Sequence, residues 1–257
     1  MAAAYPLLEL FAGPPTDPLP LGVRVGDLVF AAGIGGVDPA TGALGAGLDR
    51  QLALAFQNLR TVLGRAGATL DNVAHVTLYM PDLAERLAFN KPWLAAFPDA
   101  DDRPPYKYLA SPLPGGALAQ LEVFAVPGQR RRVLTTPGMA HHDPMAMGVR
   151  IGRYLFSSRI TGRDTRRDRL GEGAAEQARL AFENVRTLLE HGGATPDDLT
   201  QVTAFVTEPA HRPWIEPPWR ELFPPGSPRP PLRIVEAALP GPLVRLEIIA
   251  VLAAEAS

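Results

Sequence analysis

The chain of 257 residues is 46% hydrophobic and 20% charged, and its 25 basic and 27 acidic residues leave a formal charge of −2. This balance is typical of a folded globular protein and argues against a disordered chain or a basic surface for nucleic acid. The absence of cysteine excludes disulfides, thiolate catalysis and cysteine-bound metals, and it fits a cytoplasmic protein. The first twenty residues lack a basic segment and are broken by proline, so we expect neither a signal peptide nor a membrane anchor.

The sequence contains an internal duplication. Ala55-Phe56 recurs as Ala181-Phe182, and Gly67-Ala68-Thr69 recurs at the same spacing as Gly193-Ala194-Thr195. The repeat continues to the end of each unit, where Leu113-Pro114-Gly115 returns as Leu239-Pro240-Gly241. Internal similarity at a fixed spacing indicates a duplicated structural unit. We therefore predict two domains of the same fold, residues 1–127 and 128–257.

Both repeats predict the same order of elements. Short apolar runs around a glycine turn indicate a hairpin, apolar residues at helical spacing indicate helices, and alternating residues indicate strands. In the first repeat these elements are a hairpin at 22–31, a helix at 50–66, a strand at 76–80, a helix at 82–97, and strands at 106–111 and 118–126. In the second they are 148–157, 176–191, 202–206, 209–223, 232–237 and 243–251.

Two features refine this prediction. The segment 209–223 contains Pro213, Pro217 and Pro218, so we expect its helix to be distorted or broken. The order ββαβαββ predicts an α+β fold, in which each domain is a mixed, antiparallel-rich sheet with two helices packed on one face.

These motifs resemble the Rid family (RidA/YjgF). The resemblance rests on Gly26-Asp27-Leu28-Val29-Phe30-Ala31-Ala32-Gly33, on Gly67-Ala68-Thr69, and on Leu113-Pro114 followed by Leu121-Glu122. In the second repeat it rests on Gly193-Ala194-Thr195 and on Leu239-Pro240 with Glu247. It implies two Rid-like, chorismate-mutase-like domains, a homotrimer, and hydrolysis of small enamines or imines such as 2-aminoacrylate in clefts between neighbouring domains, without a cofactor.

The resemblance places an arginine that binds the substrate carboxylate at a position where this chain has Tyr106 and Leu232. Neither side chain pairs bidentately with a carboxylate. The neighbouring residues Lys107 and Arg233 replace it only if the strand slips by one residue, and such a slip points a side chain to the opposite face of the sheet.

The family's water-orienting glutamate is retained in both repeats, as Glu122 and Glu247. A carboxylate beside apolar neighbours holds its proton more tightly and can act as an acid or a base near neutral pH. The alternative is a solvated strand glutamate, paired in the second repeat with Arg245.

Other family positions are altered. The pocket tyrosine becomes Leu19 and Met145, and the pocket serine becomes Ala32 in the first repeat but remains Ser158 in the second. Asn90 matches a family asparagine near the site. Its partner Glu216 is either a residue at the start of a helix or a second pocket carboxylate, and Arg159 is either a substitute cation or a surface arginine.

The segment His141-His142-Asp143 is the one cluster in the sequence that suggests a metal. Adjacent histidines point apart in an extended chain, so we expect no zinc site without a further ligand. No phosphate-cradling glycine motif is present, which argues against a nucleotide or flavin cofactor.

The leading hypothesis is an atypical Rid-like hydrolase or deaminase acting on an enamine, an imine or a related unsaturated small molecule. Its chemistry lies mainly at Glu247 and Ser158, with Glu122 and Tyr106 contributing or vestigial. The alternatives are a non-catalytic Rid scaffold that binds a ligand or partner, favoured by the loss of arginine from both repeats, and a chorismatase-like lyase or hydrolase. We expect neither nucleic acid nor a membrane as a partner.

Overall fold

The computed structural model describes residues 7–8, 21–227, 229–237 and 241–253. These residues form two compact units that divide between Arg131 and Arg132. In the part of the chain that is described, no helix is long and apolar enough to cross a membrane.

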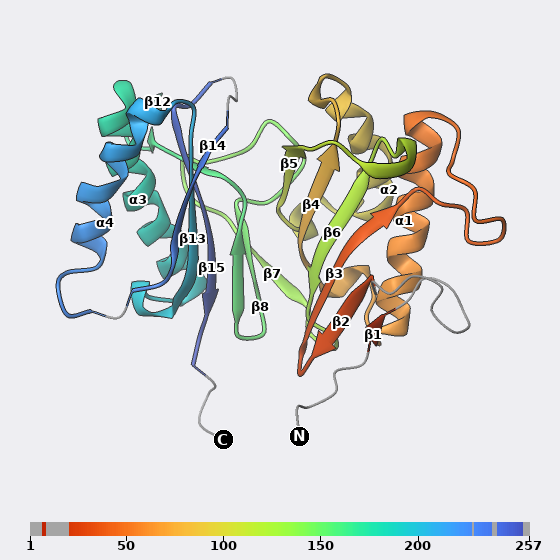
Figure 1. Ribbon diagram of the computed structural model, residues 1–257. Helices are drawn as coiled ribbons and strands as arrows, with labels where there is room; N and C mark the ends of the chain where they lie inside the picture. The colour runs from red at the N-terminus through yellow and green to blue at the C-terminus, as the bar shows by residue number, and fades with distance from the viewer. Residues whose placement is uncertain (1–6, 9–20, 228, 238–240, 254–257) are drawn as a thin grey trace. The chain divides into compact units, whose positions relative to one another are not determined.

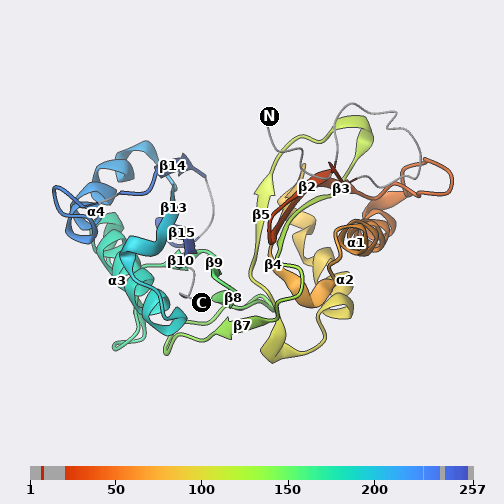
Figure 2. The same ribbon diagram turned by 90° about the horizontal axis from the view of Figure 1, so that it is seen from below.

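The first unit is a sheet with two helices on one face (Figures 1 and 2). Its strands lie side by side in the order β1-β2-β3-β6-β4-β5, with β4 and β5 parallel and the other neighbours antiparallel. The elements are β1 (Leu7–Leu8), β2 (Gly22–Val25), β3 (Leu28–Gly35), α1 (Gly47–Arg65), β4 (Val73–Met80), α2 (Asn90–Ala96), β5 (Tyr106–Ala110) and β6 (Gln120–Ala125).

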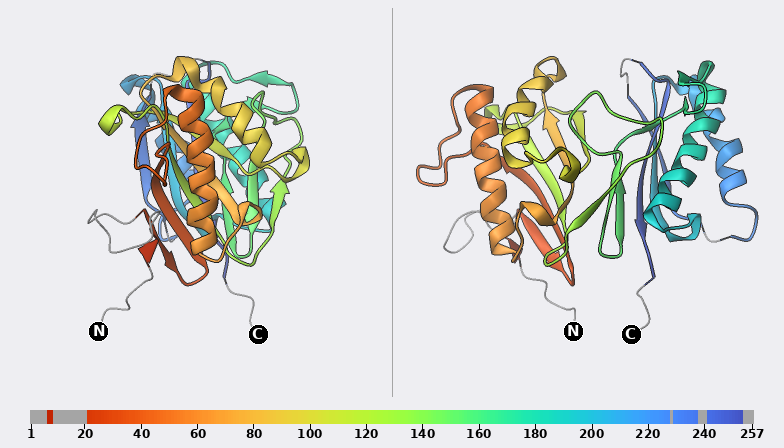
Figure 3. Two further views of the ribbon diagram at one scale, coloured as in Figure 1. Left: turned by 90° about the vertical axis from the view of Figure 1, so that its right-hand side faces the viewer. Right: turned by 180° about the vertical axis from the view of Figure 1, so that it is seen from behind.

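The second unit repeats this plan (Figure 3). Its sheet has the order β14-β13-β15-β9-β8-β7, with β13 and β14 parallel and the short β10 paired with β15. The elements are β7 (Arg131–Leu134), β8 (Gly148–Ile151), β9 (Tyr154–Ser157), β10 (Ile160–Thr161), β11 (Arg163–Asp164), β12 (Arg169–Leu170), α3 (Gly173–Gly192), β13 (Leu199–Val206), α4 (Glu216–Leu222), β14 (Leu232–Glu236) and β15 (Val244–Val251).

The predicted α+β architecture is therefore confirmed in both units. The long helices form because apolar residues recur on one side of each helix and are buried against the sheet, as Leu52, Leu59 and Leu63 are in α1. Each helix ends near a glycine with a left-handed backbone, Gly67 at φ 72° and Gly193 at φ 67°, which is the conformation that glycine adopts most readily.

The second helix of each repeat differs from the prediction. The first copy was expected to form one helix over 82–97, but Leu83–Phe89 is a 3₁₀ helix that leads into the short α2. Pro92 has no N–H to donate to residue 88, so α-helical pairing cannot run through this point. The proline-rich second copy shows the predicted break, with a 3₁₀ helix over Pro209–Ile215 before α4.

Alternation along the central strands separates two faces of each sheet. On β6, Leu121, Val123 and Ala125 are buried under the helices, so Glu122 lies on the other side. On β15, Leu246 and Ile248 belong to the core, and Glu247 lies on the opposite side. We call the side of each sheet away from its helices the helix-free face. Glu122 and Glu247, which occupy matching places in the two repeats, both lie on this face.

Candidate functional site

A row of three polar residues crosses the helix-free face at the same place in both units. In the first unit Thr77 on β4 lies directly across from Glu122 on β6 and from Lys107 on β5. In the second unit Thr203 on β13 lies across from Glu247 on β15 and from Arg233 on β14. We call each set, a cation, a threonine and a glutamate on three adjacent strands, the polar row. The cation and the carboxylate lie two strands apart, so their backbones are about 10 Å apart.

In the first unit two hydroxyl groups hold the carboxylate. Thr77 Oγ1 donates a hydrogen bond of 3.2 Å to Glu122 Oε1, and the Tyr79 hydroxyl donates one of 3.3 Å to Glu122 Oε2. Because each carboxylate oxygen accepts a different hydroxyl, the side chain is fixed in one orientation across the sheet.

Aromatic residues flank this carboxylate along the same face. Phe124 follows Glu122 by two residues on β6, and its ring meets Phe30 edge to face with 5.2 Å between the centroids. Phe30 is 38% exposed, an unusual exposure for a large apolar side chain. The first polar row is therefore bordered by an apolar wall.

The second unit surrounds its glutamate with different groups. Glu247 is only 7% exposed. Thr203 Oγ1 accepts a hydrogen bond of 3.2 Å from Gln201 Nε2. Phe205 stands where the first unit has Tyr79, and the Arg159 guanidinium carbon lies 4.5 Å from the centre of its ring, a cation–π contact.

The partly buried Arg159 and the buried Arg245 accompany Glu247. Burial lowers the pKa of Arg159 to about 10, while the negative charge of Glu247 acts in the opposite direction and the positive charge of Arg245 lowers it further. Burial also lowers the pKa of Arg245, which is 8% exposed. With a pKa of about 10, the Arg159 guanidinium is still charged at neutral pH. The second face thus offers a carboxylate and neighbouring guanidinium groups, whereas the first offers a carboxylate and hydroxyls.

Ser158 is fully buried, and its hydroxyl group forms two hydrogen bonds. Its Oγ donates to the carbonyl oxygen of Met147 at 3.0 Å and lies 2.5 Å from His141 Nε2. Since the hydroxyl has one proton and gives it to Met147, the His141 Nε2–H is the donor in the second contact. Burial lowers the pKa of His141 to about 4, against the attraction of Asp143 and together with the repulsion of His142.

The contact between His141 and Ser158 was not predicted from the sequence, because His141 was considered only as a metal ligand. The two residues lie 17 positions apart, and no spacing rule links a loop histidine to a serine at the end of a strand. Among the described residues, no group of three or more His, Cys, Asp or Glu side chains is placed to hold a metal ion.

Tyr106 and Lys107 lie on the opposite faces from those expected. Tyr106 is 1% exposed on the helix-covered face, where its hydroxyl donates to Asn90 Oδ1 at 3.3 Å and accepts from Tyr108 at 3.0 Å. Lys107 lies on the face of Glu122 without any slip of the strand. The physical reason is that the Tyr106 ring packs against Trp93, with 4.6 Å between the ring centroids. This contact places Tyr106 on the helix-covered face of β5, so the next residue, Lys107, points to the other face.

The remaining candidates are divided between the two faces of the second unit. Arg233 shares the face of Glu247, and its neighbours Leu232 and Ile234 pack toward the core. Glu216 is exposed in the first turn of α4, where it pairs with Arg220 at 2.5 Å. It therefore belongs to the helix layer and not to the helix-free face. Leu19 lies outside the described residues.

The family model described as Endoribonuclease L-PSP matches the chain twice, over residues 14–126 and 139–254. The chain belongs to this family, the Rid family, as two copies in tandem. Each polar row lies within one of the two matched ranges.

Single-domain relatives match one copy at a time. A RutC family protein of Aquifex aeolicus is 30% identical over 118 residues, which is 44% of this chain and 94% of the relative. A RutC family protein of Saccharolobus solfataricus is 31% identical over 114 residues, 43% of this chain and 88% of the relative. The YjgF crystal structure from Escherichia coli has 24% identity and a TM-score of 0.44, covering 47% of this chain and 98% of that one.

Proposed function

We propose that this tandem Rid protein hydrolyses small imines and enamines that carry a carboxylate, releasing a carbonyl compound and ammonia. The observation that carries the proposal is the polar row, in which a glutamate, a threonine and a cation recur at the same register in both units. A carboxylate and a cation on strands whose backbones are about 10 Å apart suit a small substrate with a basic nitrogen at one end and a carboxylate at the other.

The glutamate supplies the proton transfers that this reaction needs. An enamine first takes a proton from solvent at carbon and becomes an iminium ion, and an imine becomes the same ion by taking a proton at nitrogen. Water then adds to the iminium carbon while the carboxylate accepts one of its protons, giving a neutral carbinolamine. The same group returns that proton to the nitrogen and then accepts the hydroxyl proton as the carbon–nitrogen bond breaks, so ammonia leaves, the carbonyl forms, and the last proton is released to solvent. One group therefore serves as base, then as acid, and again as base.

The second unit is the stronger candidate for this chemistry. Glu247 lies among groups that hold the positive charge lost from the family's arginine position, since Arg159 interacts electrostatically with Glu247 and Arg233 ends the polar row. Burial of Arg159 and Arg245 makes their attraction for an anion stronger than it would be in water. In the same unit the fully buried Ser158 accepts a hydrogen bond from His141.

The first unit has the same carboxylate but fewer charges. Its polar row ends at Lys107, and the groups around Glu122 are hydroxyls and aromatic rings. We propose that it is the weaker of the two sites.

An amino-acid oxidase that produces imino acids in the presence of the protein tests the proposal. Wild-type protein is expected to accelerate loss of the imine and release of ammonia, and a protein carrying both Glu122→Gln and Glu247→Gln is expected to lose this acceleration. Imine decay that is the same with and without wild-type protein, over several side chains, would favour a ligand-binding scaffold.

We also propose that the protein assembles as a homotrimer, as the Rid resemblance implies. Light scattering coupled to size exclusion should then give a mass near three times the 27.5 kDa of one chain. A mass of one or two chains would contradict it.

A further inference from the structure

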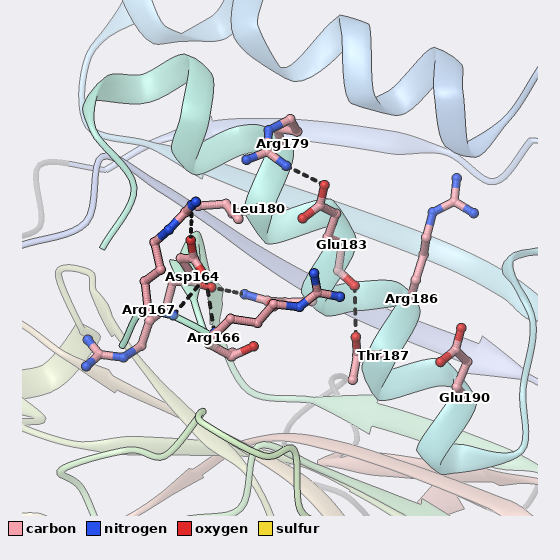
Figure 4. A pocket seen from close by; sticks show the side chains of 12 residues that line it. Asp164, Arg166, Arg167, Arg179, Leu180, Glu183, Arg186, Thr187 and Glu190 are labelled. Carbon is pink, nitrogen blue, oxygen red and sulfur yellow. Dashed lines mark hydrogen bonds and ion pairs between the residues drawn. The ribbon is translucent and has the colours of Figure 1, made fainter. Parts of the chain in front are cut away.

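The second unit has a groove rich in arginine on the side of its helices. A cavity of about 600 Å³ lies between α3 and the loop that joins β11 to β12. Five arginines line it, one from β11, two from the loop and two from α3: Arg163, Arg166, Arg167, Arg179 and Arg186. Figure 4 shows Arg179, Glu183, Arg186 and Glu190 along the helix, with Asp164, Arg166 and Arg167 beside them. We call this cavity the arginine groove.

The loop of the arginine groove is held in a fixed conformation. Asp164 is 8% exposed, and its Oδ1 accepts the backbone N–H groups of Arg166 and Arg167 at 3.1 Å each. On the helix side, Asn184 Nδ2 donates to the carbonyl oxygens of Thr161 and Arg163 at 2.9 and 3.0 Å. The loop is therefore tied both to itself and to α3.

The first unit builds the same framework without the arginines. Asp38 Oδ1 accepts the backbone N–H of Ala40 at 2.9 Å, and Asn58 Nδ2 donates to the carbonyl oxygens of Gly35 and Val37 at 2.8 Å. At the positions equivalent to the five arginines, the first unit has Val37, Ala40, Thr41, Ala53 and Arg60. Because the framework forms with one of the five cations, the other four are not needed to hold it.

Carboxylates orient several of these guanidinium groups. Arg163 pairs with Asp168 at 2.6 Å, Arg167 pairs with Asp164 at 3.0 Å, and Arg179 pairs with Glu183. A guanidinium has five N–H donors, so a group paired with one carboxylate keeps donors for a second anion. The lining contains five arginines against three acidic residues, Asp164, Glu183 and Glu190, and so carries a net positive charge.

Arg166 and Arg186 are the best placed of these cations to meet a ligand. Both are exposed. Arg186 Nη2 donates to a backbone carbonyl oxygen, that of Glu221, at 3.2 Å, and within the described residues Arg186 forms no ion pair with an acid.

We propose that the arginine groove is a binding site for a small molecule that carries phosphate groups. Guanidinium groups from two elements present many N–H donors to one cavity, which matches the several oxygens of a phosphate better than the two oxygens of one carboxylate. The volume lies within the range of small-molecule sites. The arginine groove is on the helix side of the sheet and the polar row is on the helix-free face, so this proposal does not depend on the proposed hydrolysis.

Calorimetric titration of the full chain with inorganic pyrophosphate, at a fixed and near-physiological salt concentration, tests this site. Citrate at the same concentration provides an anion whose charges are carboxylates. The variants are Arg166→Ala, which installs the residue of the first unit, and Arg186→Gln. Arg60→Gln, at the matched position of the first unit, is the control.

We expect saturable binding of pyrophosphate to the wild type, weaker binding of citrate, and a loss of affinity of about tenfold in Arg166→Ala and in Arg186→Gln. Arg60→Gln is expected to bind as the wild type does. The proposal is overturned by an absence of pyrophosphate binding, by equal binding of pyrophosphate and citrate, or by equal effects of the substitutions in both units. Because Arg60, Arg166 and Arg186 are exposed, each variant is expected to fold. Circular dichroism of each variant checks this.

Discussion

Thr77 Oγ1 donates a hydrogen bond to Glu122 Oε1 across neighbouring strands, and Thr203 stands directly opposite Glu247 at the matching place in the second unit. The pairing keeps each glutamate on the helix-free face, in line with a cation one strand beyond the threonine. The two units differ in what surrounds this shared pair, and the differences lead to separate tests.

Thr77→Val is expected to lower the free energy of unfolding by about 1 kcal/mol, because it removes one hydroxyl from Glu122 with little change in side-chain volume. Thr77 is fully buried, so water does not readily replace the lost donor. Urea unfolding measures the change. Thr77→Ser, which retains the hydroxyl, is expected to lose less stability than Thr77→Val, and the reverse order would show that the hydrogen bond is not the stabilising contact.

Tyr106→Phe and Lys107→Met separate the two faces of β5. Tyr106 lies under the helices and Lys107 shares the face of Glu122, so Tyr106→Phe is expected to leave imine turnover unchanged and lower stability by about 1 kcal/mol. In a background that carries Glu247→Gln, Lys107→Met is expected to reduce the residual turnover severalfold. Loss of turnover in Tyr106→Phe instead would place the substrate on the helix side.

The sequence was sufficient to predict the duplicated architecture, because periodicity, glycine caps and the repeat all agree. It also identified both glutamates, since they recur at the matching place in each copy. The sequence did not show which residues of β5 point to the helix-free face. Tyr106 and Lys107 are adjacent, and only the packing of the Tyr106 ring against Trp93 decides which of them lies on the face of Glu122. The contact between His141 and Ser158 depends on how a loop folds back on a strand, which no local pattern records.

His141 makes stability depend on pH. Its pKa is about 4 in the folded chain and about 6.5 when unfolded, so between these values the unfolded chain binds a proton that the folded chain does not. Stability from this residue is therefore complete above pH 6.5 and is lost as the pH falls toward 4, by about 3 kcal/mol at most. Asp143 and His142 are the neighbouring charges.

Urea unfolding at several pH values measures this effect. His141→Gln is expected to flatten the fall in stability between pH 6.5 and 4, whereas His142→Gln, at an exposed position, is expected to retain it. An unchanged pH dependence in His141→Gln would show that other groups cause the fall.

Arg159→Met is expected to raise KM for imino acids about tenfold or more, because it removes a charged donor while keeping an apolar side chain beside Phe205. The matched substrate is an imine that lacks a carboxylate, for which KM is expected to change little. An equal increase in KM for both substrates would show that Arg159 supports the fold of the site and does not bind the carboxylate.

Turnover of oxidase-generated imino acids by Glu247→Gln, measured beside Glu122→Gln, shows whether Glu247 transfers protons in the hydrolysis of an imine. The two variants remove the same charge from matched positions in the two units. Glu247→Gln is expected to lower kcat by at least about a hundredfold, because it removes a general acid–base group, whereas Glu122→Gln is expected to keep most of the activity. Full turnover in Glu247→Gln would show that Glu247 does not transfer these protons.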